Sequence, residues 1–188
     1  MLRLMNEPRD AGRRLSADDW IQAGFAILTD GGPNALRLDR LCEQLGVTKG
    51  SFYWHFADLS AYRAALLDAW AGLQDQDRQR FKDLAGAPPR ERLKAMMQAL
   101  MGPQLFALER AMRVWALTDE TVAEGVRRSD AQVLAVVHQI FIDAGFEDLD
   151  ALVRAVTFFA AGMGFLHGFD IERPSEGEDL FLDFMLRP

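Results

Sequence analysis

Residues 48–55 have the side chains and the spacing to contact nucleic acid. Thr48 is a good helix N-cap, and Lys49 after it can bond a phosphate or a guanine edge. On a helical wheel that begins at Lys49, Phe52 and Phe56 share one side. The other side carries small, hydroxyl-bearing and aromatic residues, namely Gly50, Ser51, Tyr53 and Trp54. Such a face is a poor solvent surface, but it suits phosphates and base edges in a major groove.

Further groups near this face could bind phosphate. Tyr53 and His55 can donate to phosphate oxygens, and the free N–H groups of residues 49–51 form a helix N-terminus that attracts an anion. Alternatively, Trp54 and His55 pack against the next helix. The residues that we expect to contact DNA are Arg13, Arg14, Arg37, Arg40, Thr48, Lys49, Gly50, Ser51, Tyr53, Trp54 and His55.

A helix-turn-helix over residues 38–56 would position these groups. Leu38, Leu41 and Leu45 recur at i, i+3 and i+7, which gives a short helix one apolar stripe. Gly46 then supplies a residue that leaves a helix readily with positive φ. The pattern therefore predicts a tight turn and a second short helix that begins at Lys49.

The run GVTKGSFYWHF resembles the DNA-binding domain of tetracycline-repressor-type (TetR family) transcription regulators. A helix is expected before it, from about Ala17 to Asp30, and Asp58 opens another helix after it, so the resemblance covers roughly residues 16–70. It implies an all-α fold, with an N-terminal three-helix helix-turn-helix domain followed by a larger helical domain for effector binding and dimerisation. In similar proteins a lysine that clamps a phosphate commonly stands where this chain has Leu59. Either arginines compensate for its absence, or the affinity is lower or the operator differs.

The expected organisation is a flexible basic arm (1–15), a helix-turn-helix domain (16–57) and an effector-binding and dimerisation domain (58–188). A long helix from Asp58 to about Asp83 would project from the small domain into the larger one. Breaks at Gly and Pro predict further helices at about 89–101, 104–117, 119–144, 148–168 and 178–186. The stretch 131–142 is apolar nearly all round, which predicts a central buried helix.

Charge is unevenly distributed along the 188 residues, whose net charge is −7. Residues 1–55 hold seven basic and seven acidic side chains, so the acidity belongs to residues 56–188, with 14 basic against 21 acidic. A neutral DNA-binding domain with clustered cations still neutralises phosphates, while an acidic body discourages non-specific binding. We therefore expect salt-sensitive affinity per protomer and a need for dimerisation.

Composition excludes several other classes of protein. No apolar run reaches the ~18–20 residues that span a bilayer, and the N-terminus lacks a secretion signal, so the cytoplasm is the expected location. A single cysteine, Cys42, excludes an internal disulfide and a Cys-based zinc site. The three histidines are scattered, and no catalytic triad, metal cluster or phosphate loop is present. We expect neither an enzyme nor a cofactor.

An apolar effector cavity is the second expected site. Soft and aromatic side chains around one helical core can leave an adaptable pocket, although at helical spacing they are also typical of plain core. The candidates are Met97, Met101, Phe106, Met112, Trp115, His138, Phe141, Phe158 and Phe159. For His138 the alternative is a satisfied core histidine.

A dimer interface is the third expected site. Apolar residues alternate with small ones in the stretch 149–168, and the last helix adds more apolar residues. Two such helices from each subunit would make a four-helix seam; the alternative is packing within one chain. The expected interface residues are Leu152, Val156, Phe159, Met163, Leu180, Phe181 and Phe184.

The function that this sequence favours is a ligand-responsive homodimeric transcription regulator, usually a repressor. It would bind a double-stranded, pseudo-palindromic operator and be released by a small apolar or amphipathic effector. The alternative is a DNA-binding transcription factor without an effector, controlled by a protein partner or by its abundance.

Overall fold

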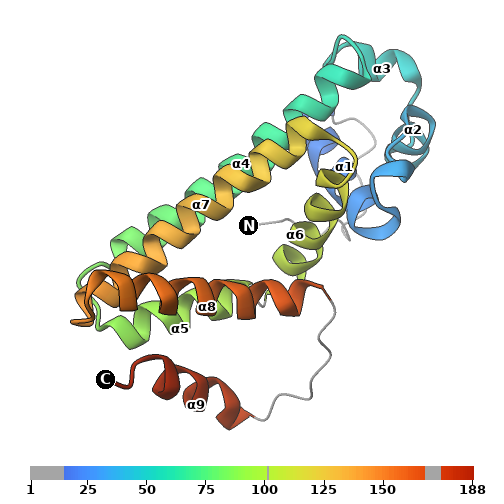
Figure 1. Ribbon diagram of the computed structural model, residues 1–188. Helices are drawn as coiled ribbons and strands as arrows, with labels where there is room; N and C mark the ends of the chain where they lie inside the picture. Colours follow the sequence, from blue (N-terminus) through green and yellow to red (C-terminus); the bar gives the residue numbers. More distant parts are fainter. Residues whose placement is uncertain (1–14, 101, 168–174) are drawn as a thin grey trace.

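The computed structural model describes residues 15–100, 102–167 and 175–188, and over these residues it contains nine α-helices, one 3₁₀ helix and no strand (Figure 1). Residues 1–14 of the predicted arm, with Arg13 and Arg14, lie outside the described residues, as does Met101, whereas Leu15 is half-buried. The helices are α1 (Ala17–Gly31), η1 (Pro33–Ala35), α2 (Leu38–Leu45), α3 (Lys49–Tyr53), α4 (Leu59–Asp83), α5 (Pro89–Leu100), α6 (Pro103–Ala116), α7 (Glu120–Asp143), α8 (Asp148–Leu166) and α9 (Ser175–Met185).

Two long helices, α4 and α7, run side by side along the molecule (Figure 1). At one end they reach the small domain formed by α1, α2 and α3. At the other end α5, α8 and α9 pack together. The all-α fold with an N-terminal helix-turn-helix domain and a larger helical domain is therefore confirmed.

Side-chain caps fix the starts of three helices. Ser16 and Asp19 form a reciprocal capping box at α1, with the Asp19 N–H donating to Ser16 Oγ at 3.2 Å. Asp58 Oδ1 accepts from the N–H of Ala61 at 2.8 Å, and Asp119 caps α7. The helix start at Asp58 was predicted, and the end of α4 at Asp83 also agrees with the prediction.

Two helices end at glycines with positive φ, Gly46 after α2 with φ of 66° and Gly145 after α7 with φ of 93°.

The bounds of some elements differ from the prediction. The 3₁₀ helix η1 lies where only a loop was expected, and α9 begins at Ser175 rather than near residue 178. Helix α8 ends at Leu166, two residues before the predicted end.

The first hydrophobic core joins the small domain to the larger one. Trp20, Phe52 and Tyr62 are fully buried in it, together with Met112 of α6 and Val122 of α7. At the closest helix crossing, the Tyr62 hydroxyl donates to the carbonyl oxygen of Trp20 at 2.7 Å. Burial raises the pKa of the Tyr62 phenol well above its ordinary value, so the hydroxyl stays protonated and keeps donating.

A second core holds the far end together. Leu93 of α5, Val137 and Phe141 of α7, Ala155 of α8 and Leu182 of α9 are fully buried there. An ion pair of 2.5 Å between Arg92 Nη1 and Asp143 Oδ2 joins α5 to α7 beside this core.

The prediction that residues 131–142 are buried all round is wrong for the single chain. Val137, Ile140 and Phe141 are buried, whereas Ala135 and Gln139 are exposed. The reason is that α4, α5, α6 and α8 pack on one side of α7 and leave its small and amide side chains facing solvent.

The crossing of α1 over α4 gives a stability prediction. A Cβ added to Gly24 would meet the Tyr62 hydroxyl and lie 2.8 Å from Leu66 Cδ2. Gly24→Ala is therefore expected to lower the free energy of unfolding by about 1–3 kcal/mol, as overpacking does. Gly72 of α4 has no atom within 4 Å of an added Cβ, so Gly72→Ala serves as the control and should be stabilising by about 0.5–1 kcal/mol. Urea denaturation measures both; equal effects would contradict the close crossing.

Candidate nucleic-acid interface

The turn between α2 and α3 sets the angle of the second helix. The N–H of Val47 donates to the carbonyl oxygen of Cys42 at 3.0 Å, which closes the turn around Gly46. Phe52 then anchors α3, with its ring 5.4 Å from Trp20 and 5.5 Å from Tyr62 between centroids. The short α3 is thus held by aromatic packing on the first core.

The opposite side of α3 faces solvent. Tyr53 is 58% exposed and Trp54 is 77% exposed, which is unusual for large aromatic side chains. Gly50 is exposed, and an added Cβ there would meet only Thr48 Oγ1, at 3.7 Å. The backbone of α3 is therefore open to close approach by a large partner, and the separation of faces matches the predicted wheel.

The predicted N-cap position of Thr48 is confirmed, whereas the predicted free N–H of Ser51 is wrong. The N–H of Ser51 donates to the carbonyl oxygen of Thr48 at 3.0 Å, so it is not free to bind a phosphate. The Thr48 side chain makes no capping hydrogen bond, although its backbone is extended as an N-cap requires. A helix of five residues closes its first turn tightly, which uses the Ser51 donor within the helix.

His55 lies away from the exposed face. It is half-buried, and its ring centroid is 6.4 Å from that of Trp20 and 6.2 Å from that of Phe56. His55 therefore packs toward Trp20 and Phe56, whereas Trp54, which the alternative also placed against the next helix, is exposed.

Acidic neighbours accompany the cations of this domain. Lys49 Nζ lies 2.5 Å from Asp39 Oδ1, and Arg40 Nη2 lies 2.7 Å from Asp30 Oδ2, while Arg37 is exposed. The Lys49 ammonium bonded to Asp39 holds the pKa of that carboxyl below its usual range, and the carboxylate raises the pKa of Lys49. Both groups stay charged near neutral pH, so DNA phosphates must compete with Asp39 for Lys49.

The described part of the small domain is acidic. Residues 15–58 contain three basic side chains, Arg37, Arg40 and Lys49, against six acidic ones, Asp18, Asp19, Asp30, Asp39, Glu43 and Asp58, a net charge of −3. The neutrality of residues 1–55 therefore depends on the four arginines of residues 1–14. Leu59, which replaces the expected lysine, is half-buried against the first core.

The eight candidate effector residues that the structure describes do not share one site. Met112 and Trp115 are buried in the first core, and Phe141 and Phe158 in the second. Met97, Phe106 and Phe159 are half-buried. His138 is partly exposed, with Nε2 3.2 Å from Asp148 Oδ1.

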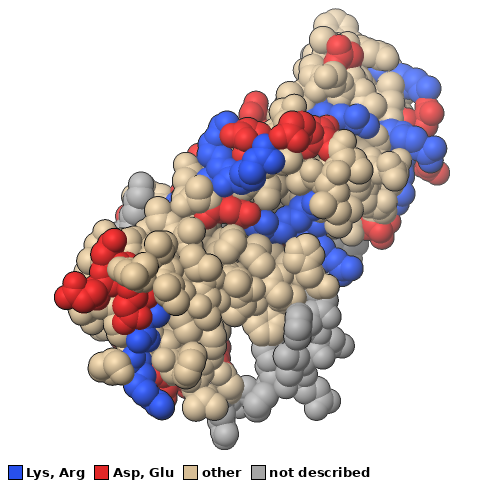
Figure 2. Space-filling view, in the orientation of Figure 1, with Lys and Arg blue, Asp and Glu red and all other residues tan. Residues whose placement is uncertain are grey.

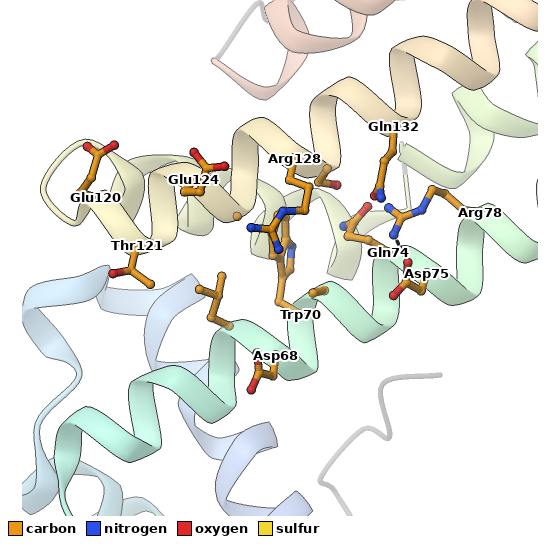
Figure 3. Close-up of a pocket in the computed structure, with 14 residues that line it drawn as sticks. Asp68, Trp70, Gln74, Asp75, Arg78, Glu120, Thr121, Glu124, Arg128 and Gln132 are labelled. Atoms are coloured by element: carbon orange, nitrogen blue, oxygen red, sulfur yellow. Dashed lines mark hydrogen bonds and ion pairs between the residues drawn. The ribbon is translucent and has the colours of Figure 1, made fainter.

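A groove with a volume of about 660 Å³ lies between α4 and α7 (Figure 3). Its walls are residues 67–78 of α4 and residues 120–132 of α7, and most of the side chains are polar. None of the described effector candidates lines it. The sequence did not predict this groove, because the predicted effector site was an apolar cavity and most of the groove's side chains are polar. Within the described residues, no cluster of side chains is suited to a metal ion.

Helices α8 and α9 expose apolar side chains on one part of the surface. Among the predicted interface residues, Leu152 and Val156 are exposed on α8, as are Leu180 and Phe184 on α9, whereas Phe159, Met163 and Phe181 are half-buried. Leu149 (73% exposed) and Val153 (57%) are more exposed than Leu152 and Val156 of the same helix but are not among the predicted interface residues. Figure 2 shows a broad area over α8 with few charged side chains.

Helix α8 is also long and apolar enough to cross a membrane by length and composition, with a mean hydropathy of 1.5 and 22% of the span buried. The expectation that no segment of the chain reaches that length and apolarity is therefore wrong. This property alone is weak evidence for a membrane span, because an apolar helix that packs on protein passes the same test.

Comparisons with known proteins agree with this arrangement. Residues 21–59 match the family model described as bacterial regulatory proteins, tetR family. A transcriptional regulator from Rhodococcus sp. Rha1 superposes with a TM-score of 0.71 at 21% identity, covering 92% of this chain and 94% of that one. A TetR transcription regulator from Legionella pneumophila gives a TM-score of 0.73 at 12% identity, covering 96% and 98%. One from Haloarcula marismortui gives 0.67 at 20% identity, covering 90% and 93%. The search of curated proteins gave no match.

The class that the fold and the exposed helix define is a helix-turn-helix DNA-binding protein. Residues 21–59 match the DNA-binding region of the tetR family of bacterial regulatory proteins, and the whole chain shares the fold of solved TetR-family regulators. The matched region is that of DNA-binding transcriptional regulators.

The pairing of Lys49 with Asp39 gives a prediction about DNA affinity. Asp39→Asn should tighten DNA binding by about two- to fivefold, because an exposed ion pair is worth up to about 1 kcal/mol and Lys49 is released from it. Glu43→Gln removes the same charge from α2 without a partner in the described residues, and should change the affinity by less than about twofold. Fluorescence anisotropy with labelled DNA measures both; equal tightening would show that only net charge matters.

Proposed function

We propose that this regulator is a homodimeric repressor that binds a pseudo-palindromic operator and is released by a small-molecule effector. The observation that carries DNA contact is the exposed aromatic face of α3, Tyr53 and Trp54, held on a rigid aromatic anchor. Large exposed aromatics on a fixed helix need a partner surface. We retain residues 16–57 as the DNA-binding unit and residues 58–188 as the effector and dimerisation unit.

In this proposal α3 enters the major groove. Lys49, Gly50 and Ser51 lie at its start, where a recognition helix reads base edges, while Tyr53 and Trp54 reach phosphate and sugar. Arg37 and Arg40 contact the backbone beside it. Because residues 15–58 carry a net charge of −3, we assign much of the phosphate neutralisation to Arg13 and Arg14 of the arm.

The dimer would form through α8 and α9. Leu152, Val156, Leu180 and Phe184 are exposed apolar residues on these two helices, and burial of such surface stabilises association. A partner subunit would also account for the apolar character of α8 without a membrane, in keeping with a cytoplasmic protein.

Release would follow from a movement of α4. This helix carries Tyr62 and Leu66 in the first core and continues for 25 residues from Leu59 into the larger domain. An effector that favours a different position of α4 would move the two copies of α3 away from a spacing of about 34–36 Å, one helical turn of DNA. The ligand needs only to prefer the non-binding spacing.

The second candidate is a transcription factor controlled by a protein partner or by abundance. Four of the predicted effector residues are buried in two separate cores, Met112 and Trp115 in one and Phe141 and Phe158 in the other, which favours this alternative. Gel shifts with an operator selected from random DNA, with and without candidate compounds, separate the two. A compound that changes operator affinity supports the effector; if only a cell protein changes it, the effector is excluded.

Dimerisation through α8 and α9 can be tested by placing a charge on the face. Val153→Asp and Phe184→Asp should each raise the dimer dissociation constant by at least about tenfold, because a carboxylate would be buried without a partner. Leu117→Asp, at an 82% exposed position after α6, is the control and should leave the dimer intact. Sedimentation velocity at micromolar concentration measures this. A wild-type chain that is a monomer there would contradict the dimer.

The proposed contacts of α3 differ in what they determine. Tyr53→Phe removes only a hydroxyl that would donate to phosphate, so binding should weaken similarly for every DNA sequence. Lys49→Ala should change the preferred bases, with about 1–3 kcal/mol of discrimination lost at one position of each half-site. Binding to an operator library measures both variants, and the same preference profile for the two would reject this division.

A further inference from the structure

The groove between α4 and α7 is polarised along its length (Figure 3). Glu120, Thr121 and Glu124 lie toward one end. Arg78, Gln74 and Gln132 lie toward the other end and point toward one another, and Arg128 extends from α7 toward Trp70 between them. Hydrogen-bond donors are thus gathered in the centre and at one end of the groove.

Among these donors, Arg78 is the one with a buried nitrogen that lacks a hydrogen-bond partner in the described chain. Its side chain is only 14% exposed, and Asp75 accepts a hydrogen bond from Nη2. Its Nη1 is buried and has no hydrogen-bond partner within the described structure. A buried guanidinium N–H without an acceptor is costly, so this atom is suited to an acceptor from outside the chain.

Arg128 adds a second available cation. Neither Arg128 nor Gln132 makes a hydrogen bond or ion pair with the part of the chain that the structure describes, although both line the groove. Two guanidinium groups on facing helices form a natural site for a carboxylate or a phosphate.

The acidic residues of the groove are partly neutralised by ion pairs. Arg127 Nη2 lies 2.6 Å from Glu120 Oε1 and 2.9 Å from Glu124 Oε2, and Asp75 is paired with Arg78. Asp68, which has no such partner in the described chain, points away from Arg128 (Figure 3). Arg128 is therefore the charged side chain at the centre of the groove that makes no ion pair with the described chain.

Apolar groups form the neighbouring wall. Leu67 and Ala71 of α4 line the groove, and the helices come close where a Cβ added to Gly125 would lie 2.9 Å from Leu67 Cδ1. A ligand with an apolar part would bury it against this wall, beside its charged end.

We propose that the α4–α7 groove binds a small organic anion, with its carboxylate or phosphate held by Arg78 and Arg128 and its apolar part against Leu67 and Ala71. That this anion is the effector rests on the function proposed above. The site touches the helix that would have to move, since α4 residues 67–78 follow directly on Tyr62 and Leu66 of the first core. A ligand that bridges α4 and α7 favours one relative position of the two helices.

Titration calorimetry on the full-length protein tests the site with benzoate, phenyl phosphate and benzamide. One of the two anions should bind, and which one binds identifies the anionic group. Benzamide, the neutral isostere of benzoate, should bind at least about tenfold more weakly than the bound anion, because charge-assisted hydrogen bonds are the stronger ones. Absence of binding by both anions, or equal binding of benzamide, overturns the proposal.

Variants locate the site. Arg78→Gln and Arg128→Gln should each weaken anion binding by about ten- to a hundredfold. Arg110→Gln, at an exposed position of α6 outside the groove, is the matched control and should change it by less than about twofold. Because Arg128 is exposed, its variant remains informative even if Arg78→Gln lowers stability. Unchanged anion affinity in both groove variants overturns the site.

Measurements of operator affinity test whether an anion bound in the groove also regulates DNA binding. With an operator selected by the wild-type protein, the bound anion should change DNA affinity in wild type and not in Arg128→Gln. Anion binding with unchanged operator affinity supports the site and overturns its role as the effector site. Failure to bind any DNA would instead reject the repressor function, while the titrations still decide whether the groove binds anions.

Discussion

The contact on which the arrangement depends is the crossing of α1 over α4. There the Tyr62 hydroxyl donates to the Trp20 carbonyl inside a cluster of aromatic rings that also anchors α3 through Phe52. Gly24 allows the two helices to come this close. Since the same residue, Tyr62, belongs to α4 and to the core of the small domain, the orientation of α3 is tied to the position of α4. A hydrogen bond buried among rings resists sliding, because moving it would leave two polar groups unsatisfied.

The larger domain holds α4 from the other side through buried polar groups. Trp70 Nε1 donates to Glu109 Oε1 of α6 at 2.7 Å, and Gln74 donates to the same oxygen. Arg113 of α6 makes two hydrogen bonds to Asp130 of α7, at 3.0 and 2.6 Å. These bonds join α4, α6 and α7 next to the polar groove. The groove is thus the place where a small molecule could shift α4 relative to α7, and the aromatic crossing is what would carry that shift to α3.

Local signals made much of the fold predictable. The cap at Asp58 and the turn at Gly46 act within a few residues, so the helix-turn-helix and the start of α4 followed from the sequence. Features that join distant elements did not follow. The pairing of Lys49 with Asp39, the inward packing of His55 and the polar groove all depend on how helices are placed in space. The one-sided burial of α7 also escaped prediction, since an apolar sequence does not reveal how many sides are covered.

The central claim is that the small domain and the adjoining parts of α6 and α7 form one cooperative unit, because they share a core. Native-state hydrogen exchange at increasing denaturant measures it most directly, by comparing amides of α1 with those of residues 108–126. The account predicts that both segments open with the same free energy and the same denaturant dependence. Opening of α1 at distinctly lower denaturant, while residues 108–126 remain protected, would contradict it.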